Sequence, residues 1–330
     1  MDARENILLI RLKSIGDIVF TLPAVHAVRE NFPRAKLHFL VSKENAQILR
    51  GFADVDEIIA LDRAVYRSVN LPAMGARTFQ LLRRLRRENF SLAIDFHGLG
   101  ETALLSWWSG APERWGSVHQ VARGWAYTHG VRHGGAAHPV EENLNLLRQC
   151  GLDIGRVRNE YVLPDDALTE ARRFFAANHL DAGRPTLFIQ PFTSNLQKNW
   201  PLENFLKLAR YWQKHGVQII FGGGPSERAA LEAAPTKSFC IAAGTSLLVS
   251  SGLMKLSTLV IGADTGLLHL AVAMGKRVVM LMRSNTRCRT HSFQHPDWTI
   301  AAPDGQPLSG VEFNTVIEAS AQTLDGAIAA

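Results

Sequence analysis

The chain has 330 residues, 46% of them hydrophobic, which is enough for two cores of roughly 150 residues each. Lys and Arg outnumber Asp and Glu by 36 to 30, and three cysteines without a C-x-x-C spacing indicate neither a disulfide framework nor a zinc site. Charges in M-D-A-R-E-N argue against a signal peptide, and Asp264 and His269 interrupt the most apolar run. We therefore expect a cytoplasmic protein in a reducing compartment.

The first half of the chain alternates buried-strand patterns with helical ones. The apolar run Ile7–Arg11 leads into the loop L-K-S-I-G-D and a helical pattern over Ile18–Asn31, in which Pro23 marks a first turn or a kink. Only Gly16 is available in that loop, so the G-x-G-x-x-G fingerprint of a nicotinamide enzyme is absent. The pattern predicts a parallel α/β domain, with further strands at 36–41, 57–61 and 92–96 and helices at 44–51 and 77–88.

Polar residues follow the first and fourth of these strands. Asp17 lies at the start of a helix beside Gly16, where an Asp serves as an N-cap or, if it points into the crevice, takes a proton from a hydroxyl nucleophile. The spacing alone does not choose between these roles. The fourth strand runs into D-F-H-G, so Asp95 and His97 are expected to face the same crevice.

Basic and aromatic residues are unevenly distributed in this half. Arg77–Arg87 reads R-T-F-Q-L-L-R-R-L-R-R, which is either a solvated helix face or a surface for an anionic acceptor, a phospholipid headgroup or nucleic acid. No nucleic-acid-binding motif accompanies the charge. Four tryptophans follow: Trp107, Trp108, Trp115 and Trp125. The same region has four histidines, which lack regular metal-ligand spacing and are interpreted as surface or acceptor-side residues: His119, His129, His133 and His138. A helix over 138–150 closes this half.

A polar stretch at 151–185 indicates the linker, and we expect domains at 1–165 and 166–330. The second half repeats the plan of the first, with a helix opened by Pro201. The last helix, predicted at 312–324, is a candidate to pack back across the first domain. Strands are predicted at 186–190, 217–221, 239–242, 258–261 and 278–282.

Two polar loops of this half carry candidate ligand-binding residues. Thr193, Ser194 and Lys198 lie in P-F-T-S-N-L-Q-K-N-W, and two hydroxyls with a lysine before a helix suit a diphosphate, although Lys198 is equally typical of a surface charge. The turn G-G-G-P-S-E places Gly223 where backbone approaches a ligand. Its Glu227 either accepts hydrogen bonds from a ribose diol or is an ordinary first-turn glutamate.

The third loop, D-T-G-L-L-H, joins a buried strand to an apolar helix. It offers an anion the Thr265 hydroxyl, the amides of Gly266 and Leu267 and the positive end of a helix dipole. His269 lies four residues after Thr265, on the same helical face. The alternative is a plain connection with Asp264 as N-cap and a packed histidine. No acidic metal cluster is apparent, and a helix dipole with a lysine can replace a divalent ion.

Five motifs in order resemble the bacterial ADP-heptose:lipopolysaccharide heptosyltransferases, glycosyltransferase family nine. They are L-L-I-R-L-K-S-I-G-D-I-V-F-T-L-P, E-N-F-S-L-A-I-D-F-H-G, K-N-W-P, G-G-P-S-E and G-A-D-T-G-L-L-H-L, which together span most of the chain. The resemblance implies a GT-B fold, that is, two facing doubly wound Rossmann-like domains with an interdomain cleft. It also implies inverting transfer of heptose from ADP-heptose to a lipopolysaccharide core precursor, without a cofactor.

Carried over by position, Asp17 resembles the catalytic base, and Lys198 a diphosphate contact that stabilises the leaving group. Arg11 stands where members often have lysine, Gln190 where many have histidine, and R-S-N-T-R-C-R-T replaces the common G-P-T-x-P turn. No metal ligand is expected. The expected substrate-binding residues are Arg11, Ser14, Gly16, Asp95, His97, Thr193, Ser194, Gly223, Glu227, Asp264, Thr265, Gly266, Leu267 and His269.

The implied partners are an ADP-sugar donor and an anionic glycolipid acceptor, with contact at the cytoplasmic face of the inner membrane and no nucleic acid. Two alternatives stay open at this point. One is a GT-B transferase that uses another nucleotide sugar, and the other is a binding protein that holds a nucleotide sugar without turnover.

Overall fold

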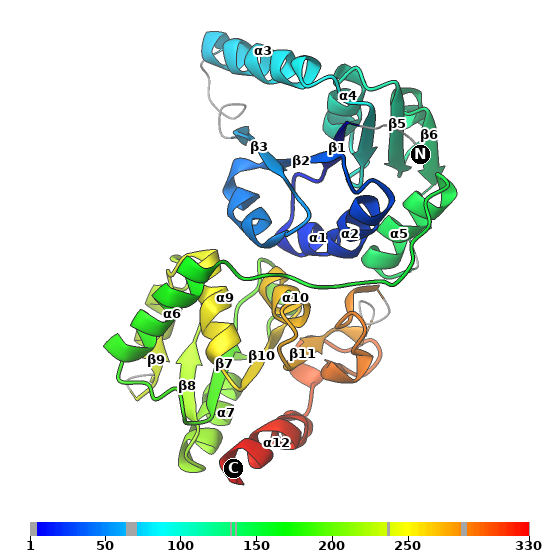
Figure 1. Ribbon diagram of the computed structural model, residues 1–330. Helices are drawn as coiled ribbons and strands as arrows, with labels where there is room; N and C mark the ends of the chain where they lie inside the picture. Colours follow the sequence, from blue (N-terminus) through cyan, green and yellow to red (C-terminus); the bar gives the residue numbers. More distant parts are fainter. Residues whose placement is uncertain are drawn as a thin grey trace. The chain divides into compact units, whose positions relative to one another are not determined.

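The computed structural model describes residues 5–63, 71–132, 134–135, 137–235, 238–284 and 289–329. The chain forms two compact units, Met1–Tyr161 and Val162–Ala330 (Figure 1). Cys150 and Cys240 are free thiols. Two features of the sequence named above, His133 and the centre of R-S-N-T-R-C-R-T with the third cysteine, Cys288, lie outside the described residues.

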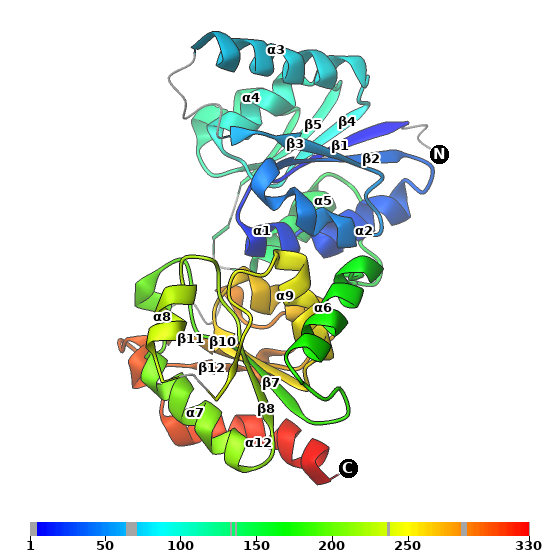
Figure 2. The same cartoon turned by 90° about the vertical axis from the view of Figure 1, so that its left-hand side faces the viewer.

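The first unit is built on a parallel sheet of six strands in the order β3-β2-β1-β4-β5-β6. The helices α3 and α4 cover one face of this sheet, and α1, α2 and α5 cover the other (Figures 1 and 2). From β1 the chain adds β2 and β3 on one side and then β4, β5 and β6 on the other, so the strand order reverses between β1 and β4. The elements are β1 (Asn6–Ile10), α1 (Ile15–Val19), α2 (Leu22–Asn31), β2 (Lys36–Ser42), η1 (Lys43–Gly51), β3 (Glu57–Leu61), α3 (Leu71–Arg87), β4 (Leu92–Asp95), α4 (Gly100–Trp108), β5 (Glu113–Val118), η3 (Val121–Ala126), β6 (His129–Arg132) and α5 (Pro139–Gln149).

The pattern predicted at 18–31 as one helix forms two helices in the structure. The chain turns at Phe20 and Thr21, where the Thr21 hydroxyl donates to the Ile18 carbonyl at 2.7 Å and Asn143 Nδ2 donates to the Phe20 carbonyl at 2.9 Å. Pro23 lies in the first turn of α2, where its missing N–H costs nothing. The proline therefore marks a first turn and not a kink.

The strands β5 and β6 were not predicted. Their sequences, E-R-W-G-S-V and H-G-V-R, contain glycine and charge instead of an apolar run. Gly116 is required in β5 because a Cβ there would overlap the Tyr127 ring.

The expectation that His138 lies at the surface is wrong. This residue is buried and caps α5, and its Nδ1 accepts a hydrogen bond from the Val140 amide at 3.2 Å.

The second unit repeats the arrangement with strand order β12-β11-β10-β7-β8-β9, again all parallel. Here the order reverses between β7 and β10. Its elements are α6 (Asp165–Ala177), β7 (Thr186–Gln190), η4 (Leu196–Lys198), α7 (Leu202–Lys214), β8 (Gln218–Phe221), α8 (Arg228–Ala233), β9 (Cys240–Ile241), α9 (Leu247–Leu256), β10 (Leu259–Ala263), α10 (Gly266–Ala273), β11 (Val278–Met282), η5 (Pro296–Trp298), β12 (Thr299–Ala301), η6 (Leu308–Gly310) and α12 (Phe313–Ala329).

The last helix, α12, packs within the second unit against α7, β10 and β11. Trp200 Nε1 donates to the Val311 carbonyl at 3.2 Å, and Trp212 Nε1 donates to Ser320 Oγ at 3.0 Å. Both tryptophans are fully buried, and the same core includes Leu324. Among the described residues, no helix has the length and apolar character that crossing a membrane requires.

Candidate active site

Polar loops gather where the strand order of each sheet reverses. In the first unit the loops after β1 and β4 are neighbours, and in the second unit the loops after β7 and β10 are neighbours. In an open parallel sheet this point leaves a crevice outside the carboxyl ends of the strands, where ligands bind. Each unit therefore has one favoured place for a site, and each is described separately.

In the first unit Asp17 is tied to the loop after β1. Its Oδ1 lies 2.9 Å from Arg11 Nη2, and its Oδ2 accepts from the Ser14 amide at 3.0 Å and from Ser14 Oγ at 2.9 Å. Asp17 is the third residue of α1 and Ser14 is the N-cap, so Asp17 is not the N-cap of the alternative interpretation. Gly16, the second residue of α1, is buried. These contacts fix the carboxylate at the carboxyl edge of the sheet.

The environment of Asp17 stabilises its ionised form. Burial by itself would raise the pKa of this carboxyl, but the charge of Arg11 and the hydrogen bonds from Ser14 outweigh it, and the pKa lies below its usual value. The side chain is still about one third exposed. Asp17 is thus an ionised, accessible proton acceptor at neutral pH.

Asp95, at the end of β4, is fully buried and holds the D-F-H-G turn. Its Oδ1 accepts from the amides of His97 and Gly98 at 2.8 and 3.1 Å, and its Oδ2 accepts from the Tyr127 hydroxyl at 2.7 Å. Burial raises its pKa despite these bonds. Gly98 has φ +65°, and a Cβ there would overlap the Ser117 carbonyl oxygen. The turn therefore has one permitted shape.

That turn aims His97 back at the first loop. His97 Nδ1 accepts from the Leu12 amide at 3.3 Å, and Arg11 Nη1 donates to the neighbouring Phe96 carbonyl at 2.6 Å. Burial, followed by the charge of Arg11, lowers the pKa of His97 to about 3. The ring is therefore neutral, and because Nδ1 is an acceptor the proton is assigned to Nε2. Such a histidine donates a hydrogen bond and is a poor general base.

In the second unit Asp264 joins the loops after β7 and β10. Its Oδ2 lies 2.8 Å from Lys198 Nζ, and its Oδ1 lies 2.9 Å from His269 Nε2. Burial alone would raise the pKa of Asp264, but His269 and Lys198 lower it to about 2. The carboxylate therefore holds the Lys198 ammonium beside the start of α10.

The start of α10 has the composition of an anion site. Thr265 is the N-cap, and its hydroxyl accepts from the Leu268 amide at 3.4 Å, so Asp264 is not the cap. The amides of Gly266 and Leu267, both half-buried, donate to no acceptor within the described part of the chain. Two unsatisfied donors, a helix dipole and a neighbouring lysine favour a phosphate group.

Two of the other predicted donor-loop residues, Thr193 and Glu227, form hydrogen bonds within their own turns. Thr193 Oγ1 donates to the Asn195 carbonyl at 2.7 Å, and Ser194 is exposed. Glu227 accepts from the Gly224 amide beside the half-buried Gly223. These loops follow β7 and β8, which are adjacent strands. Within the described residues Lys198 contacts the Asp264 carboxylate, whereas no contact joins Thr193, Ser194 or Glu227 to it.

Three contacts at these sites were not anticipated. Thr290 Oγ1 approaches Asp264 Oδ2 at 3.4 Å from the divergent stretch after β11, where no family pattern pointed to it. Tyr127 holds Asp95 across 32 positions of sequence. Gln190 is buried, with its Oε1 making no hydrogen bond in the described structure, while its Nε2 donates to the Phe192 carbonyl at 3.3 Å.

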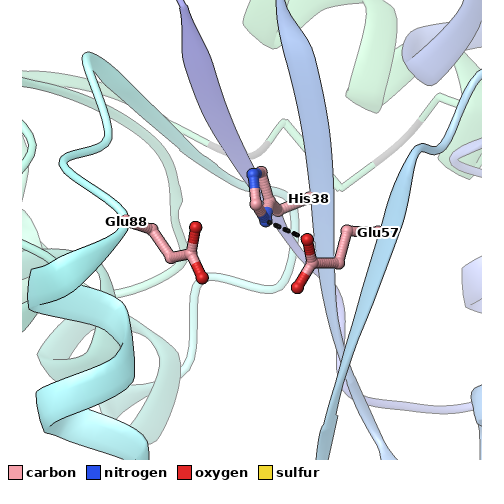
Figure 3. Close-up of side chains that lie close together, drawn as sticks. All are labelled: His38, Glu57 and Glu88. Atoms are coloured by element: carbon pink, nitrogen blue, oxygen red, sulfur yellow. Dashed lines mark ion pairs between the residues drawn. The ribbon is translucent and has the colours of Figure 1, made fainter.

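A separate cluster lies near the amino ends of the first sheet, away from the loops described above. His38, Glu57 and Glu88 point toward one another with ligand atoms within 4.8 Å (Figure 3). Lys36 Nζ, however, lies 2.5 Å from Glu57 Oε2, and Arg84 contacts the other oxygen. Because two cations already neutralise this carboxylate, we describe the cluster as an ion-pair network and assign it no metal.

Two doubly wound units, each with a crevice at the reversal of strand order, are the units of the GT-B fold, and solved structures share this fold. A family 9 glycosyltransferase from Veillonella parvula aligns with a TM-score of 0.87 at 20% identity over 98% of both chains. The Escherichia coli heptosyltransferase WaaC, solved with ADP-2-deoxy-2-fluoro heptose, aligns with a TM-score of 0.76 at 21% identity, over 96% of this chain and 99% of its own. The expected GT-B fold is confirmed.

Sequence comparisons agree. The lipopolysaccharide core heptosyltransferase OpsX of Haemophilus influenzae is 21% identical over 96% of this chain and 92% of its own length. Lipopolysaccharide heptosyltransferase 1 of Escherichia coli K12 is 23% identical over 82% and 85%, respectively. The model of glycosyltransferase family 9 (heptosyltransferase) matches residues 78–308. The chain therefore belongs to glycosyltransferase family 9, as its motifs indicated, and is a glycosyltransferase.

Proposed function

We propose that this protein transfers a heptose from ADP-heptose to a hydroxyl of a lipopolysaccharide core precursor, with inversion at the anomeric carbon. The substrates follow from the family and from the names of its relatives. The observation that carries the mechanism is the accessible Asp17 carboxylate, kept ionised by Arg11 and Ser14 at the strand-order reversal of the first sheet. In this proposal residues 1–165 bind the acceptor and residues 166–330 bind the donor.

The proposed step is a single displacement. The acceptor hydroxyl attacks the anomeric carbon and gives its proton to Asp17, while the bond from that carbon to the ADP oxygen breaks with its electron pair. One displacement inverts the centre. The low pKa of Asp17 makes it fully ionised in the resting enzyme, and proton transfer becomes favourable as the attacking hydroxyl grows more acidic. His97 is proposed to donate a hydrogen bond from Nε2–H to the bound substrate. Asp95 holds the turn that orients His97.

The departing ADP accumulates negative charge, and the donor unit has groups suited to it. The proposed diphosphate ligands are Lys198, which Asp264 holds, and the amides of Gly266 and Leu267. Thr193 and Ser194 add hydroxyls from the preceding loop. The turn at Gly223 and Glu227 follows the adjacent strand, and we assign it to the ribose of the nucleotide. Charge stabilisation by these groups needs no additional cofactor.

The test replaces Asp17 by Asn. Asn still accepts a hydrogen bond from Ser14 but has no carboxylate to take a proton, so kcat should fall by about 10² to 10⁴ while ADP affinity stays close to the parent. The measurement is acceptor-dependent ADP release from ADP-heptose, with ADP binding by calorimetry. Asp54→Asn, which removes a carboxylate paired with His26 elsewhere in the same unit, is the matched control.

Each outcome has a definite meaning. Near-parent kcat in Asp17→Asn would remove Asp17 as the base. Faster turnover of a GDP- or UDP-sugar would make the protein a different GT-B transferase. Donor binding without acceptor-dependent ADP release would make it a nucleotide-sugar-binding protein and would reject the proposed reaction.

A further inference from the structure

Exposed apolar side chains of the first unit gather on α4 and η3. Large side chains there are unusually open, Leu104 being 49%, Trp107 41%, Val121 71% and Trp125 59% exposed. The two segments pack against each other. Single exposed apolar residues are ordinary, but a contiguous group that includes tryptophans marks an interaction surface.

The helix α4 has apolar side chains on its outer face. Thr102, Ala103, Leu105 and Ser106 are buried, whereas Leu104, Trp107 and Trp108, at positions i, i+3 and i+4, face outward. A helix on a water-exposed surface normally buries its apolar stripe and exposes its hydroxyls. The outer face of α4 is therefore suited to a medium less polar than water.

The tryptophan rings form one continuous group. Trp107 lies with its ring centroid 5.9 Å from that of Trp108 and 6.0 Å from that of Trp125, both in edge-on geometry. Trp125 comes from η3, so the group joins two segments of the chain. We call this group, with Leu104 and Val121, the tryptophan surface.

Arginines border the tryptophan surface on the side of α3. Arg86 Cζ lies 5.8 Å from the centre of the Trp108 ring. Arg83, Arg86 and Arg87 are exposed and form no ion pair with any described residue, whereas Arg77 and Arg84 of the same helix pair with Asp62 and Glu57. Arg83, Arg86 and Arg87 thus add positive charge that no acidic partner among the described residues offsets.

The acidic residue of α4 does not oppose this charge. Glu101, in the first turn of α4, lies 3.1 Å from Arg63 and is paired with it. The border is therefore positive, and a negatively charged partner surface is complementary to it. The positive border thus favours a negatively charged partner, and the exposed tryptophans favour a partner with an apolar region.

We propose that the tryptophan surface inserts into the interfacial region of a bilayer that contains anionic phospholipids, with Arg83, Arg86 and Arg87 contacting headgroup phosphates. Tryptophan prefers the boundary between headgroups and acyl chains because one end of its ring is apolar and the other is polar. Arginines close to an anionic leaflet add attraction that falls with salt. A lipid-linked acceptor would be presented at such a surface, but binding to the bilayer requires neither donor nor turnover.

The experiment measures co-sedimentation of the full chain with vesicles of phosphatidylcholine, with and without phosphatidylglycerol. The parent should bind the anionic vesicles and lose this binding as salt is added. Trp107→Ser with Trp125→Ser should reduce partitioning by at least about tenfold, since two apolar side chains no longer leave water. Arg83→Glu with Arg87→Glu should reduce it by at least about fivefold per arginine.

Matched controls lie in the second unit. Tyr211→Ser removes an exposed aromatic residue, and Arg172→Glu with Arg210→Glu reverses two exposed charges. Both should bind vesicles as the parent does. Thermal melting confirms that each variant is folded.

Insertion is read separately from adsorption. Phospholipids brominated along the acyl chain should quench the parent's fluorescence, and the Trp107→Ser/Trp125→Ser variant should lose most of this quenching. It keeps only Trp108 of the tryptophan surface, and Trp115, Trp200 and Trp212 are buried in the protein. Binding without quenching, or tryptophan variants that bind as Tyr211→Ser does, would overturn the proposal. So would self-association of the parent that the tryptophan variant abolishes while vesicle binding is absent, which would assign the surface to a second copy.

Discussion

Replacing Asp264 by Asn tests whether the carboxylate that holds Lys198 also holds the second unit together. The ionised carboxylate interacts with Lys198 at 2.8 Å and His269 at 2.9 Å, and its side chain is 9% exposed. Its pKa of about 2, against an ordinary 3.8, corresponds to about 2 kcal/mol of stability at neutral pH. Asn resembles the protonated acid and should lose about this amount.

The pH dependence separates this charge effect from a packing effect. A depressed pKa stabilises the fold above the unfolded-state value and loses that contribution as pH falls through the folded-state value. The stability difference between parent and Asp264→Asn should therefore be about 2 kcal/mol near pH 6 and smaller by about 1 kcal/mol near pH 3. The titration window lies between about pH 4 and pH 2.

The assay is hydrogen exchange of β10 peptides in increasing urea, which reports the second unit alone. Asp297→Asn is the control, because this exposed carboxylate pairs with Arg277 at 3.2 Å on the surface of the same unit. It should leave the acid dependence unchanged. A parent-to-variant difference that stays constant from about pH 6 to about pH 3 would refute the reasoning, since it would mean that Asn disturbs packing and that the charge contributes nothing.

Two further predictions concern the cations at the sites. Arg11→Gln removes the guanidinium 2.9 Å from Asp17, so burial should raise the pKa of Asp17 and the acid limb of the kcat/KM profile should move to higher pH. Arg11→Lys keeps the positive charge and should retain the parent profile. Identical acid limbs in all three proteins would contradict this prediction. Lys198→Met should weaken ADP binding by about tenfold or more in calorimetry, as loss of one charge-assisted contact predicts. The exposed Lys207→Met is its control, and an unchanged Kd for ADP would remove Lys198 from the site.

The sequence predicted the sheets better than it predicted the contacts. Continuous apolar runs such as Thr186–Gln190 and Val278–Met282 form the strands expected of them, because strands buried on both faces have that composition. The strands β5 and β6 were missed because they contain glycine and charged residues. β6 is the edge strand and is largely exposed, and β5, next to it, packs on Tyr127.

Pairings between distant residues could not be derived from spacing. The S-x-x-D spacing of Ser14 and Asp17 carries a local capping signal that sequence reasoning could have used. In contrast, Lys198 and Asp264 are 66 positions apart and meet only because β7 and β10 are neighbours in the folded sheet. Thr290 reaches the same carboxylate from a segment whose sequence departs from the family pattern, so no motif pointed to it.

The packing of α12 also determines when the core of the second unit can be completed during translation. The core of the second unit includes Val316 and Leu324, and α12 supplies Ser320 as the partner of Trp212. A nascent chain therefore leaves Trp200 and Trp212 uncovered until translation has passed Leu324, whereas the described strands of the first unit have all been synthesised once residue 161 is made. Since domains generally fold in the order of their synthesis, the unit with the proposed donor site is the one that keeps apolar core surface exposed longest during synthesis.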